Sequence, residues 1–375
     1  MNILFLLRTL DPSTGGIQRV TSLVSRKLEN KGINCFFAYK DESESDIPSD
    51  KTIHLRINHF CFKSKDAFLV FLKENSIDYL INQDIYLYPL LKAFREIKKK
   101  NICKIINYFH LSPNFFLYDK RSHIRLLDFL FRIFFQMPYH VHSRHLMYDI
   151  ADRYVMLSET FKSDFQKLYK ISDGAKLFFI PNPLTYSVIE DISILSKKKK
   201  QVLILTRFNE RQKNICSALR IWKKIEQLNP VLDWKLLLGG YGQDEKMILN
   251  YAESLNLRNF IFLGKVNKAK RLYEESSVFM MTSKFEGFGM TLTEAQQNAC
   301  VPIAFNTFPV LGEIIDNGSN GFCIENENEA DYAEKLNLLI KDDELRTQMS
   351  KRCLDYVRKY EWNNLEKKWL ELLGV

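Results

Sequence analysis

Residues 2–32 read NILFLLRTLDPSTGGIQRVTSLVSRKLENKG and contain a strand, a loop and a helix in succession. NILFLL is a short apolar run of the buried-strand type, and LDPSTGG has the Pro, Ser and paired Gly of a loop. The rest places Val20, Val24 and Leu28 at helical spacing, and Gly32 ends the helix. A buried strand followed by an amphipathic helix is the repeating unit of a parallel α/β sheet.

The same alternation continues along the chain. Further strand-like segments are INCFFAY, DYLINQ, CKIINYFH, QVLILTRF, FIFLGKV, VFMMTS and VPIAFN. Helical segments such as LKAFREIKKK and ICSALRIWKKIEQ lie between them. The sequence therefore predicts an α/β fold with parallel sheets covered by helices on both faces.

The length of 375 residues suits two domains better than one. Pro-Asn-Pro at 181–183 breaks regular structure, and SILSKKKK at 193–200 has the polar, basic composition of a linker. We expect an N-terminal domain at 1–185 and a C-terminal domain at 186–359. A last helix at about 360–375 should pack back on the first domain.

Composition excludes several classes of protein. The seven cysteines are scattered singly, so no disulfide framework and no zinc site are indicated, and a reducing cytoplasm is expected. The net charge of +9 would suit nucleic acid, an anionic membrane or phosphorylated small molecules, or it reflects solvated lysine clusters such as 197–200. No nucleic-acid-reading motif accompanies the charge.

The N-terminus lacks a basic region and a cleavage site, so no signal peptide is predicted, and no apolar run is long enough to span a bilayer. Residues 122–149 are strongly apolar and aromatic, with Arg125, Arg132 and Arg144 among or beside the apolar positions. This segment is either a buried helix or a surface that contacts a membrane interface.

Residues 283–295, SKFEGFGMTLTEA, follow the strand VFMMTS and precede a helix. Ligands of doubly wound folds bind at the carboxyl ends of strands, and helix N-termini attract anions. Glycines allow the backbone to approach a ligand closely, and a glutamate can accept hydrogen bonds from sugar hydroxyls. The alternative is structural: Thr291 as N-cap and Glu294 three positions later fit a capping box.

The segment Glu286-GFGMTLT-Glu294 resembles the E-x7-E signature of the retaining family 4 glycosyltransferases. Further matching segments, in the family's order, are Gly15-Gly16 before a helix, ADRYVMLSE, IPNPL, TRFNERQKN, LLLGGYG and FLGKV. The resemblance covers nearly the whole chain and implies a GT-B fold, in which two Rossmann-like doubly wound domains face each other across a cleft.

The resemblance also implies a donor site for a nucleotide sugar, most readily a UDP- or GDP-sugar. Its residues would be Gly15, Gly16, Arg207, Lys213, Glu286, Gly287, Phe288, Gly289, Met290, Thr291 and Glu294. Glu286 would hold a sugar hydroxyl and Glu294 the ribose. This sequence departs from the family's pattern at Thr206 and Asn214, where the family usually has glycine.

Arg207 and Lys213 suit the chemistry of a nucleoside diphosphate leaving group. Fixed cations stabilise the negative charge that grows as the glycosidic bond breaks, and arginine can bind phosphate in bidentate fashion. No Asp-x-Asp triplet occurs in the chain, so neither a metal nor another cofactor is expected. The cations would come from side chains.

His110 ends the strand IINYFH, also at a carboxyl end. Alone it is as consistent with a structural histidine as with a catalytic one. The resemblance places a histidine here that faces the donor sugar, which implies polar stabilisation or acceptor positioning. With Glu286, Arg207 and Lys213 it completes the predicted catalytic set.

The resemblance thus implies a cytoplasmic glycosyltransferase that retains anomeric configuration and acts in surface-polysaccharide biosynthesis, such as that of capsule or lipopolysaccharide. Its partners would be a nucleotide sugar and a glycan or lipid-linked saccharide at an anionic membrane face, and not nucleic acid. The alternatives are a GT-B nucleotide-sugar epimerase, a non-enzymatic binding module and a structural subunit of an assembly complex.

Overall fold

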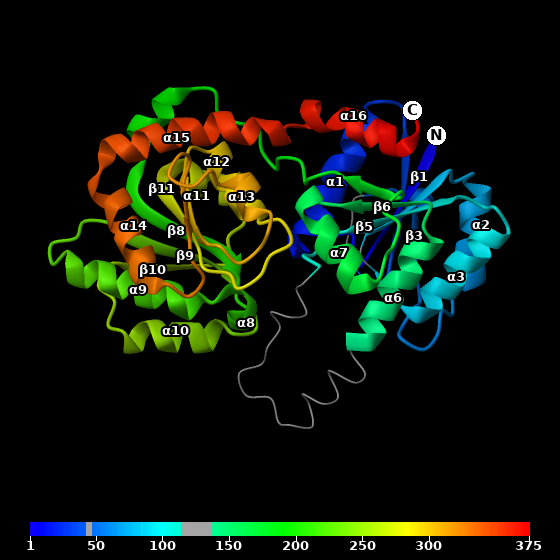
Figure 1. Cartoon of the computed structure of the whole chain (residues 1–375), viewed down its shortest axis with the longest axis horizontal. Helices are drawn as coiled ribbons and strands as arrows, with labels where there is room; N and C mark the ends of the chain where they lie inside the picture. Colours follow the sequence, from blue (N-terminus) through cyan, green and yellow to red (C-terminus); the bar gives the residue numbers. More distant parts are fainter. Residues whose placement is uncertain (43–46, 84, 114–136) are drawn as a thin grey trace. The chain divides into compact units, whose positions relative to one another are not determined.

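The computed structural model describes residues 1–42, 47–83, 85–113 and 137–375. Within these ranges the chain forms two compact units. Residues 1–113, 137–185 and 365–375 belong to the first unit, and residues 186–364 belong to the second. Each unit is an α/β layer structure with one parallel sheet, as the alternation of strands and helices predicts (Figure 1).

The first unit has a sheet of seven parallel strands in the order β3-β2-β1-β4-β5-β6-β7. The strands are β1 Asn2–Leu7, β2 Asn34–Tyr39, β3 Thr52–His54, β4 Tyr79–Gln83, β5 Lys104–Phe109, β6 Arg153–Met156 and β7 Leu177–Phe179. The helices are α1 Gly16–Glu29, α2 Lys65–Glu74, α3 Tyr88–Lys99, α6 Met137–Ile150 and α7 Lys162–Tyr169.

The last helix, α16 Trp362–Leu373, carries the chain from the second unit into the first. Successive side chains of a strand point to opposite faces of its sheet. On β5, Tyr108 packs against Trp369 of α16, whereas Phe109 packs against Phe165 of α7. Helices therefore cover both faces of the first sheet, and residues 365–375 are part of that cover.

The second unit has a sheet of six parallel strands in the order β10-β9-β8-β11-β12-β13. The strands are β8 Lys199–Arg207, β9 Lys235–Tyr241, β10 Phe260–Gly264, β11 Ser276–Met281, β12 Val301–Phe305 and β13 Phe322–Ile324. The helices are α8 Glu210–Lys213, α9 Ile215–Leu228, α10 Glu245–Ser254, α11 Ala269–Glu275, α12 Met290–Gln297, α13 Leu311–Ile314, α14 Glu329–Lys341 and α15 Asp343–Val357.

The core of the second unit lies between the sheet and the amphipathic faces of α9, α10 and α14. Trp222 of α9 and Tyr332 of α14 are fully buried there. Helices α9 and α12 lie on opposite sides of the sheet (Figure 1). Burial of strand residues on both faces explains the continuous apolar runs of these strands.

The basic stretch before β8 is more ordered than a linker. Residues Ile192–Lys197 form a 3-10 helix, and Lys199 and Lys200 already belong to β8. The structure differs here from the sequence interpretation because the strand begins two residues before its apolar run.

Candidate functional site

The candidate donor residues of the second unit lie around the point where its strand order reverses. Strands β8 and β11 are neighbours, and the chain proceeds outward from them in opposite directions. Arg207 is the last residue of β8, and residues 282–289 form the loop that follows β11. Such a switch point, at the carboxyl ends of parallel strands, is where doubly wound sheets bind ligands.

The short helix α8 is tied to the loop after β11 by hydrogen bonds to backbone carbonyls. The amide of Lys284 donates to the carbonyl of Gln212 at 2.8 Å. The hydroxyl of Thr282 lies 3.1 Å from the carbonyl of Lys213 and 3.0 Å from that of Asn214, and donates to them. These contacts bring together two segments that are about 70 residues apart in the sequence.

Lys213 and Glu286 form an ion pair at this junction. The Lys213 ammonium lies 2.5 Å from a carboxylate oxygen of Glu286, and the two side chains are only 17% and 11% exposed. The two residues were predicted from separate motifs and for separate parts of the donor. Because their charges already satisfy each other, an anion that approaches Lys213 competes with Glu286.

The N-terminus of α12 differs from the capping-box interpretation, which is wrong. The helix begins at Met290, and its N-cap is Gly289, which makes no side-chain capping bond. Gly289 has φ +80, the left-handed region that a residue without Cβ adopts most easily. Thr291 is therefore already inside the helix.

Glu294 is buried and binds another element instead. The hydroxyl of Tyr273, on α11, donates to a Glu294 carboxylate oxygen at 3.0 Å. Burial raises the pKa of Tyr273 well above its usual value, so this hydroxyl stays protonated. Sequence reasoning did not identify Tyr273, and no local pattern in RLYEES distinguishes it from a core tyrosine.

The other residues of the loop offer mainly backbone atoms. The ring of Phe288 is buried and packs edge-on against Tyr360. Gly287, Met290 and Thr291 are partly exposed. Amide groups at this helix start are thus the groups that an anion could meet.

The two departures from the family's glycine positions have different surroundings. Asn214 has φ 50 and ψ 45, a left-handed conformation that asparagine tolerates better than most residues. Thr206 lies against the next strand, where a Cβ added to Gly240 would come 1.8 Å from the Thr206 carbonyl oxygen. Here Gly240, and not residue 206, provides the close approach of the backbones, while Arg207 beyond it is exposed.

In the first unit, His110 follows β5 and is buried. Its Nε2 forms a short hydrogen bond with the side-chain oxygen of Gln83, at the end of β4, and its ring stacks on Tyr108 at 4.3 Å. Burial lowers the pKa of His110 to about 3, so the ring is neutral near pH 7. Gln83 was not predicted, although a polar residue at the carboxyl end of a buried strand is a usable signal.

Gly15 and Gly16 lie at the start of α1, after the loop that follows β1. Gly15 is the N-cap residue in an extended conformation, and Gly16 is the first, exposed residue of the helix. In the first sheet the strand order reverses between β1 and β4. The glycine loop thus follows one of the two strands that flank this reversal, and Gln83 ends the other.

Part of the basic, aromatic segment at 122–149 can be described. Residues 122–136 with Arg125 and Arg132 lie outside the described residues, but Arg144 lies on α6 and is buried. Its guanidinium lies 3.9 Å from the ring centre of Tyr86 and 4.3 Å from that of Phe109. Of the two alternatives for this segment, the buried one holds for Arg144, because aromatic rings enclose its charge.

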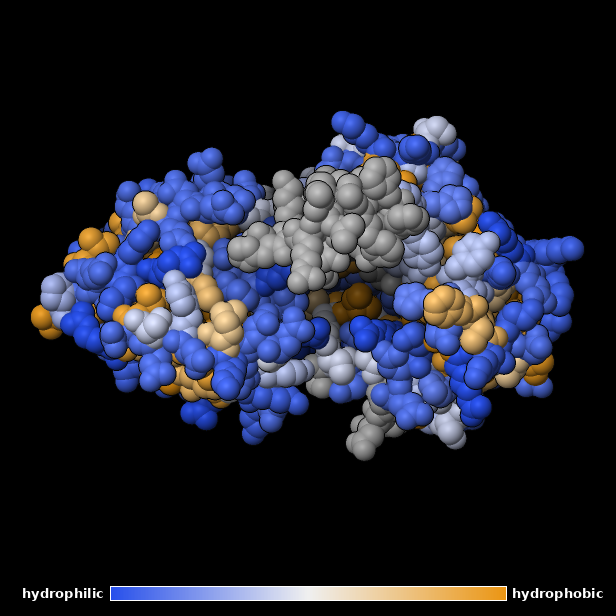
Figure 2. Space-filling view, turned by 90° about the horizontal axis from the view of Figure 1, so that it is seen from below, coloured by the Kyte–Doolittle hydropathy of each residue, from blue (hydrophilic) through white to orange (hydrophobic). Residues whose placement is uncertain are grey.

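The surface carries no large apolar area in the described regions that Figure 2 shows; hydrophobic residues appear as small separate spots. None of the described helices is long and apolar enough to cross a membrane. In the same residues, no group of three or more His, Cys, Asp or Glu side chains could hold a metal ion.

Comparisons with known proteins agree with this architecture. The Staphylococcus aureus protein TarM, solved with fondaparinux, α-GlcNAc-glycerol and UDP, matches with a TM-score of 0.75 at 14% identity, over the whole of both chains. That likeness concerns the fold. Two Rossmann-like units of parallel α/β structure define the GT-B class.

Residues 188–353 match the family model described as "Glycosyl transferases group 1". A Haemophilus influenzae protein named as an uncharacterized glycosyltransferase is 25% identical over 371 residues, which cover 96% of this chain and 97% of the relative. A Campylobacter jejuni α-1,4-N-acetyl-D-galactosaminyltransferase is 24% identical over 233 residues, or 62% of each chain. Residues 188–353, most of the second unit, thus match the group 1 glycosyltransferases, and the relatives of the chain carry glycosyltransferase names.

Proposed function

We propose that this protein is a retaining glycosyltransferase that moves a sugar from a UDP- or GDP-sugar to a glycan acceptor in surface-polysaccharide biosynthesis. The observation that carries the proposal is the ion pair of Lys213 and Glu286 in the loop that leads into α12, at the strand-order reversal of the second sheet, with Glu294 on the same helix. It combines a cation, two carboxylates and helix-start amides within one short stretch of the fold.

Each group has a role that its chemistry supports. Lys213 and the exposed Arg207 neutralise the diphosphate, together with the amides at the start of α12. When the donor binds, a sugar hydroxyl donates a hydrogen bond to the Glu286 carboxylate. Lys213 then leaves Glu286 and pairs with a phosphate oxygen. Glu294, held by Tyr273, accepts hydrogen bonds from the ribose.

In the transfer step the bond between the anomeric carbon and the diphosphate oxygen breaks, and the acceptor hydroxyl attacks the same face of the sugar. Its proton passes to the departing diphosphate oxygen, so atoms and charges balance. The neutral His110 and the Gly15-Gly16 loop are the contributions that we propose for the first unit. Side-chain cations replace a metal, so EDTA should leave the rate unchanged.

The choice of donor and acceptor draws on two relatives. The TarM structure contains UDP, and the name of the C. jejuni enzyme describes a saccharide linked to diphospho-undecaprenol as its substrate. A lipid-linked acceptor of that kind would place this protein in the cytoplasm at the inner face of the membrane.

A thermal-shift panel of UDP- and GDP-sugars tests the donor site, because a ligand that binds only the native state raises its stability. A shift with one nucleotide class that Glu294→Ala abolishes supports the proposal. Absence of any shift would overturn it. The anomeric configuration of the product, determined by NMR, tests retention: an inverted linkage would contradict the mechanism.

Flotation with anionic vesicles tests membrane contact. We expect the wild-type protein to float, and a variant with Arg125→Glu and Arg132→Glu to stay in solution. The buried Arg144 is not part of this test, since its substitution would perturb the core. Equal flotation of both proteins would show that residues 122–149 do not bind lipid through these charges.

A further inference from the structure

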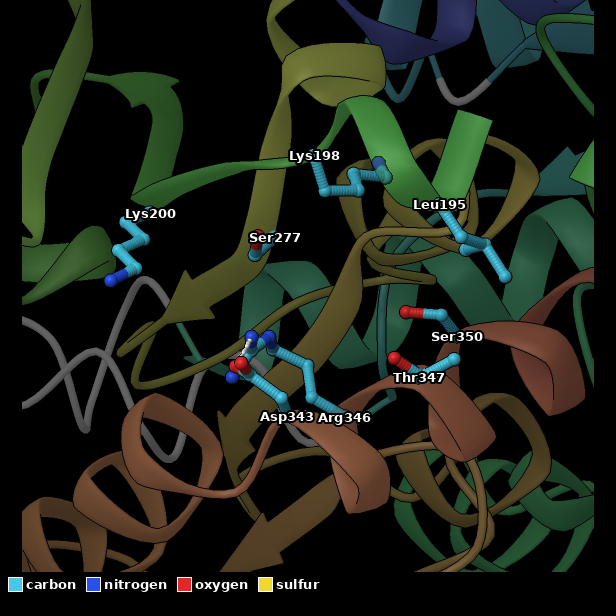
Figure 3. A pocket seen from close by; sticks show the side chains of 8 residues that line it. All are labelled: Leu195, Lys198, Lys200, Ser277, Asp343, Arg346, Thr347 and Ser350. Atoms are coloured by element: carbon cyan, nitrogen blue, oxygen red, sulfur yellow. Dashed lines mark hydrogen bonds and ion pairs between the residues drawn. The ribbon is translucent and has the colours of Figure 1, made fainter. Parts of the chain in front are cut away.

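Lys198 lies in the lysine run 197–200, but its environment differs from that of its neighbours. Lys199 and Lys200 have exposed side chains and form surface ion pairs with Glu275 and Asp233. The ammonium of Lys198 instead turns inward, toward backbone carbonyl groups. In Figure 3, the side chains of Lys198 and Lys200 point away from each other.

The Lys198 ammonium donates to three backbone carbonyl oxygens. They belong to Tyr273 at 2.8 Å, Ser276 at 2.9 Å and Asn298 at 2.5 Å. Tyr273 lies in the last turn of α11, Ser276 begins β11, and Asn298 is the C-cap of α12. A cation is favourable there because carbonyls at helix C-termini lack intrahelical donors and carry partial negative charge.

Two of these three residues hold Glu294. Tyr273 donates its hydroxyl to the Glu294 carboxylate at 3.0 Å. Asn298 donates its side-chain amide to the Glu294 carbonyl at 2.8 Å. One ammonium therefore connects to Glu294 by two independent routes, one through its carboxylate and one through its backbone.

We propose that Lys198 and Tyr273 are positioning residues for the donor. The Lys198 ammonium fixes α11 relative to α12, and the Tyr273 hydroxyl then orients the Glu294 carboxylate toward the ribose. This inference rests on the proposed donor role of Glu294. Neither residue touches the donor. Both act on its affinity through Glu294.

The surroundings of Lys198 make the hydrogen bonds of its ammonium sensitive to alkaline pH. Burial lowers the pKa of Lys198 to about 8, and the titratable groups on the elements packed against it are Cys300, Cys353 and Glu274. Burial raises the pKa of Cys300 to about 12 and that of Cys353 well above its usual value, so both thiols are neutral at pH 8. Loss of the proton removes one N–H donor and weakens the other two.

A cavity lies beside Lys198. It has a volume of about 240 Å³ and is lined by Lys198 together with Leu195, Ser277, Arg346 and Ser350, among others (Figure 3).

The test measures UDP and GDP affinity by calorimetry, and donor KM and kcat, in four variants. Lys198→Met keeps an unbranched side chain, one atom shorter and without the charge, and Tyr273→Phe removes one hydroxyl. Lys200→Met is the matched control from the same lysine run, and Glu294→Ala is the reference for loss of the carboxylate. Thermal denaturation of each variant reports whether it folds.

We expect Lys198→Met and Tyr273→Phe to raise the nucleotide Kd and the donor KM about tenfold, with kcat changed less than twofold, and Lys200→Met to match the wild type. In the wild type the donor KM should rise above about pH 8, and Lys198→Met should remove that rise. If Lys198→Met does not fold, the nucleotide Kd and donor KM of Tyr273→Phe test the proposal.

The outcomes separate this inference from the proposed function. If Glu294→Ala weakens nucleotide binding while Lys198→Met and Tyr273→Phe bind as the wild type does, the positioning role is wrong and the donor site stands. If Glu294→Ala itself binds nucleotide as the wild type does, the donor role of Glu294 fails, and the positioning role with it.

Discussion

The ammonium of Lys213 lies 2.5 Å from the carboxylate of Glu286, a residue 73 positions further along the chain. Each side chain is largely shielded from water, so the attraction between the two charges is screened less than on the open surface. In the absence of donor, the pair keeps both charges in place. In the proposed mechanism, donor binding replaces this contact by two others: Lys213 binds phosphate, and Glu286 binds a sugar hydroxyl.

Glu286→Gln should separate nucleotide binding from transfer. The variant should bind UDP at least as tightly as the wild type, because bare UDP has no sugar for this side chain to hold and a neutral amide no longer competes for the Lys213 ammonium. Transfer should fall about 10²-fold or more, as expected when a group that stabilises the transition state is removed. Calorimetry with UDP and initial rates with the sugar donor measure the two effects.

The control for this variant is Glu253→Gln, at an exposed glutamate of α10 that should change neither quantity. If Glu286→Gln weakened UDP binding tenfold and left the transfer rate unchanged, the assignment of Glu286 to the sugar would be wrong.

Gly289→Ala should destabilise the protein by about 1–2 kcal/mol, because a residue with Cβ pays this penalty in the left-handed region. The added Cβ would also lie 3.1 Å from the Phe308 ring, so the start of α12 would shift. Urea denaturation measures the loss, and we expect a higher donor KM.

Gly312→Ala is the matched control for this substitution. A Cβ at Gly312 meets nothing within 4 Å, so alanine there should be neutral or slightly stabilising. Equal stability of Gly289→Ala and Gly312→Ala would refute the conformational argument.

Asn214→Gly should leave the free energy of unfolding within about 0.5 kcal/mol of the wild type, whereas Asn214→Ala should cost about 1 kcal/mol. The reason is the left-handed conformation of Asn214, which joins α8 to α9. Chemical denaturation of the two variants side by side checks the order. A more stable Asn214→Ala would mean that the side chain, and not the backbone conformation, explains the asparagine.

His110 should contribute to acid instability. Its pKa is about 3 in the native protein and about 6.5 in an unfolded chain. Between these values the unfolded state binds one more proton, so stability decreases as pH falls below 6.5. From pH 7 to pH 5 the wild type should lose about 2 kcal/mol more than His110→Gln.

Urea titrations at the two pH values measure this difference, with His59→Gln, at an exposed histidine, as the control. Parallel losses in wild type and His110→Gln would show that the imidazole is protonated in the native state, and would remove its role as a neutral donor-facing group.

The alternation of strands and helices was predictable because the spacing of apolar residues within a short segment indicates its secondary structure. NILFLL and VFMMTS are apolar at nearly every position since both faces of their strands are buried. The break near residue 185 was readable for the same reason, from Pro-Asn-Pro between two series of α/β units. The candidate residues 207, 213, 286 and 294 were found from motifs, whose spacing is also local.

Contacts between distant segments were not predictable. The spacing of Thr291 and Glu294 suggested a capping box, but Gly289 starts the helix earlier and Tyr273 binds the carboxylate. The run of four lysines gave no sign that Lys198 turns inward. The composition of residues 122–149 left open whether Arg144 is buried or at a surface, and in the structure it lies among aromatic rings.

By itself, then, the sequence determined which segments are strands and helices, where the chain divides and which loops follow which strands. The tertiary structure alone decided which charges meet. Strand order brings the end of β8 next to the end of β11, and this adjacency places Lys213 on Glu286. The physical reason is that secondary structure follows from neighbours in sequence, whereas the partner of a buried charge is whatever group the packed sheet brings within hydrogen-bonding distance.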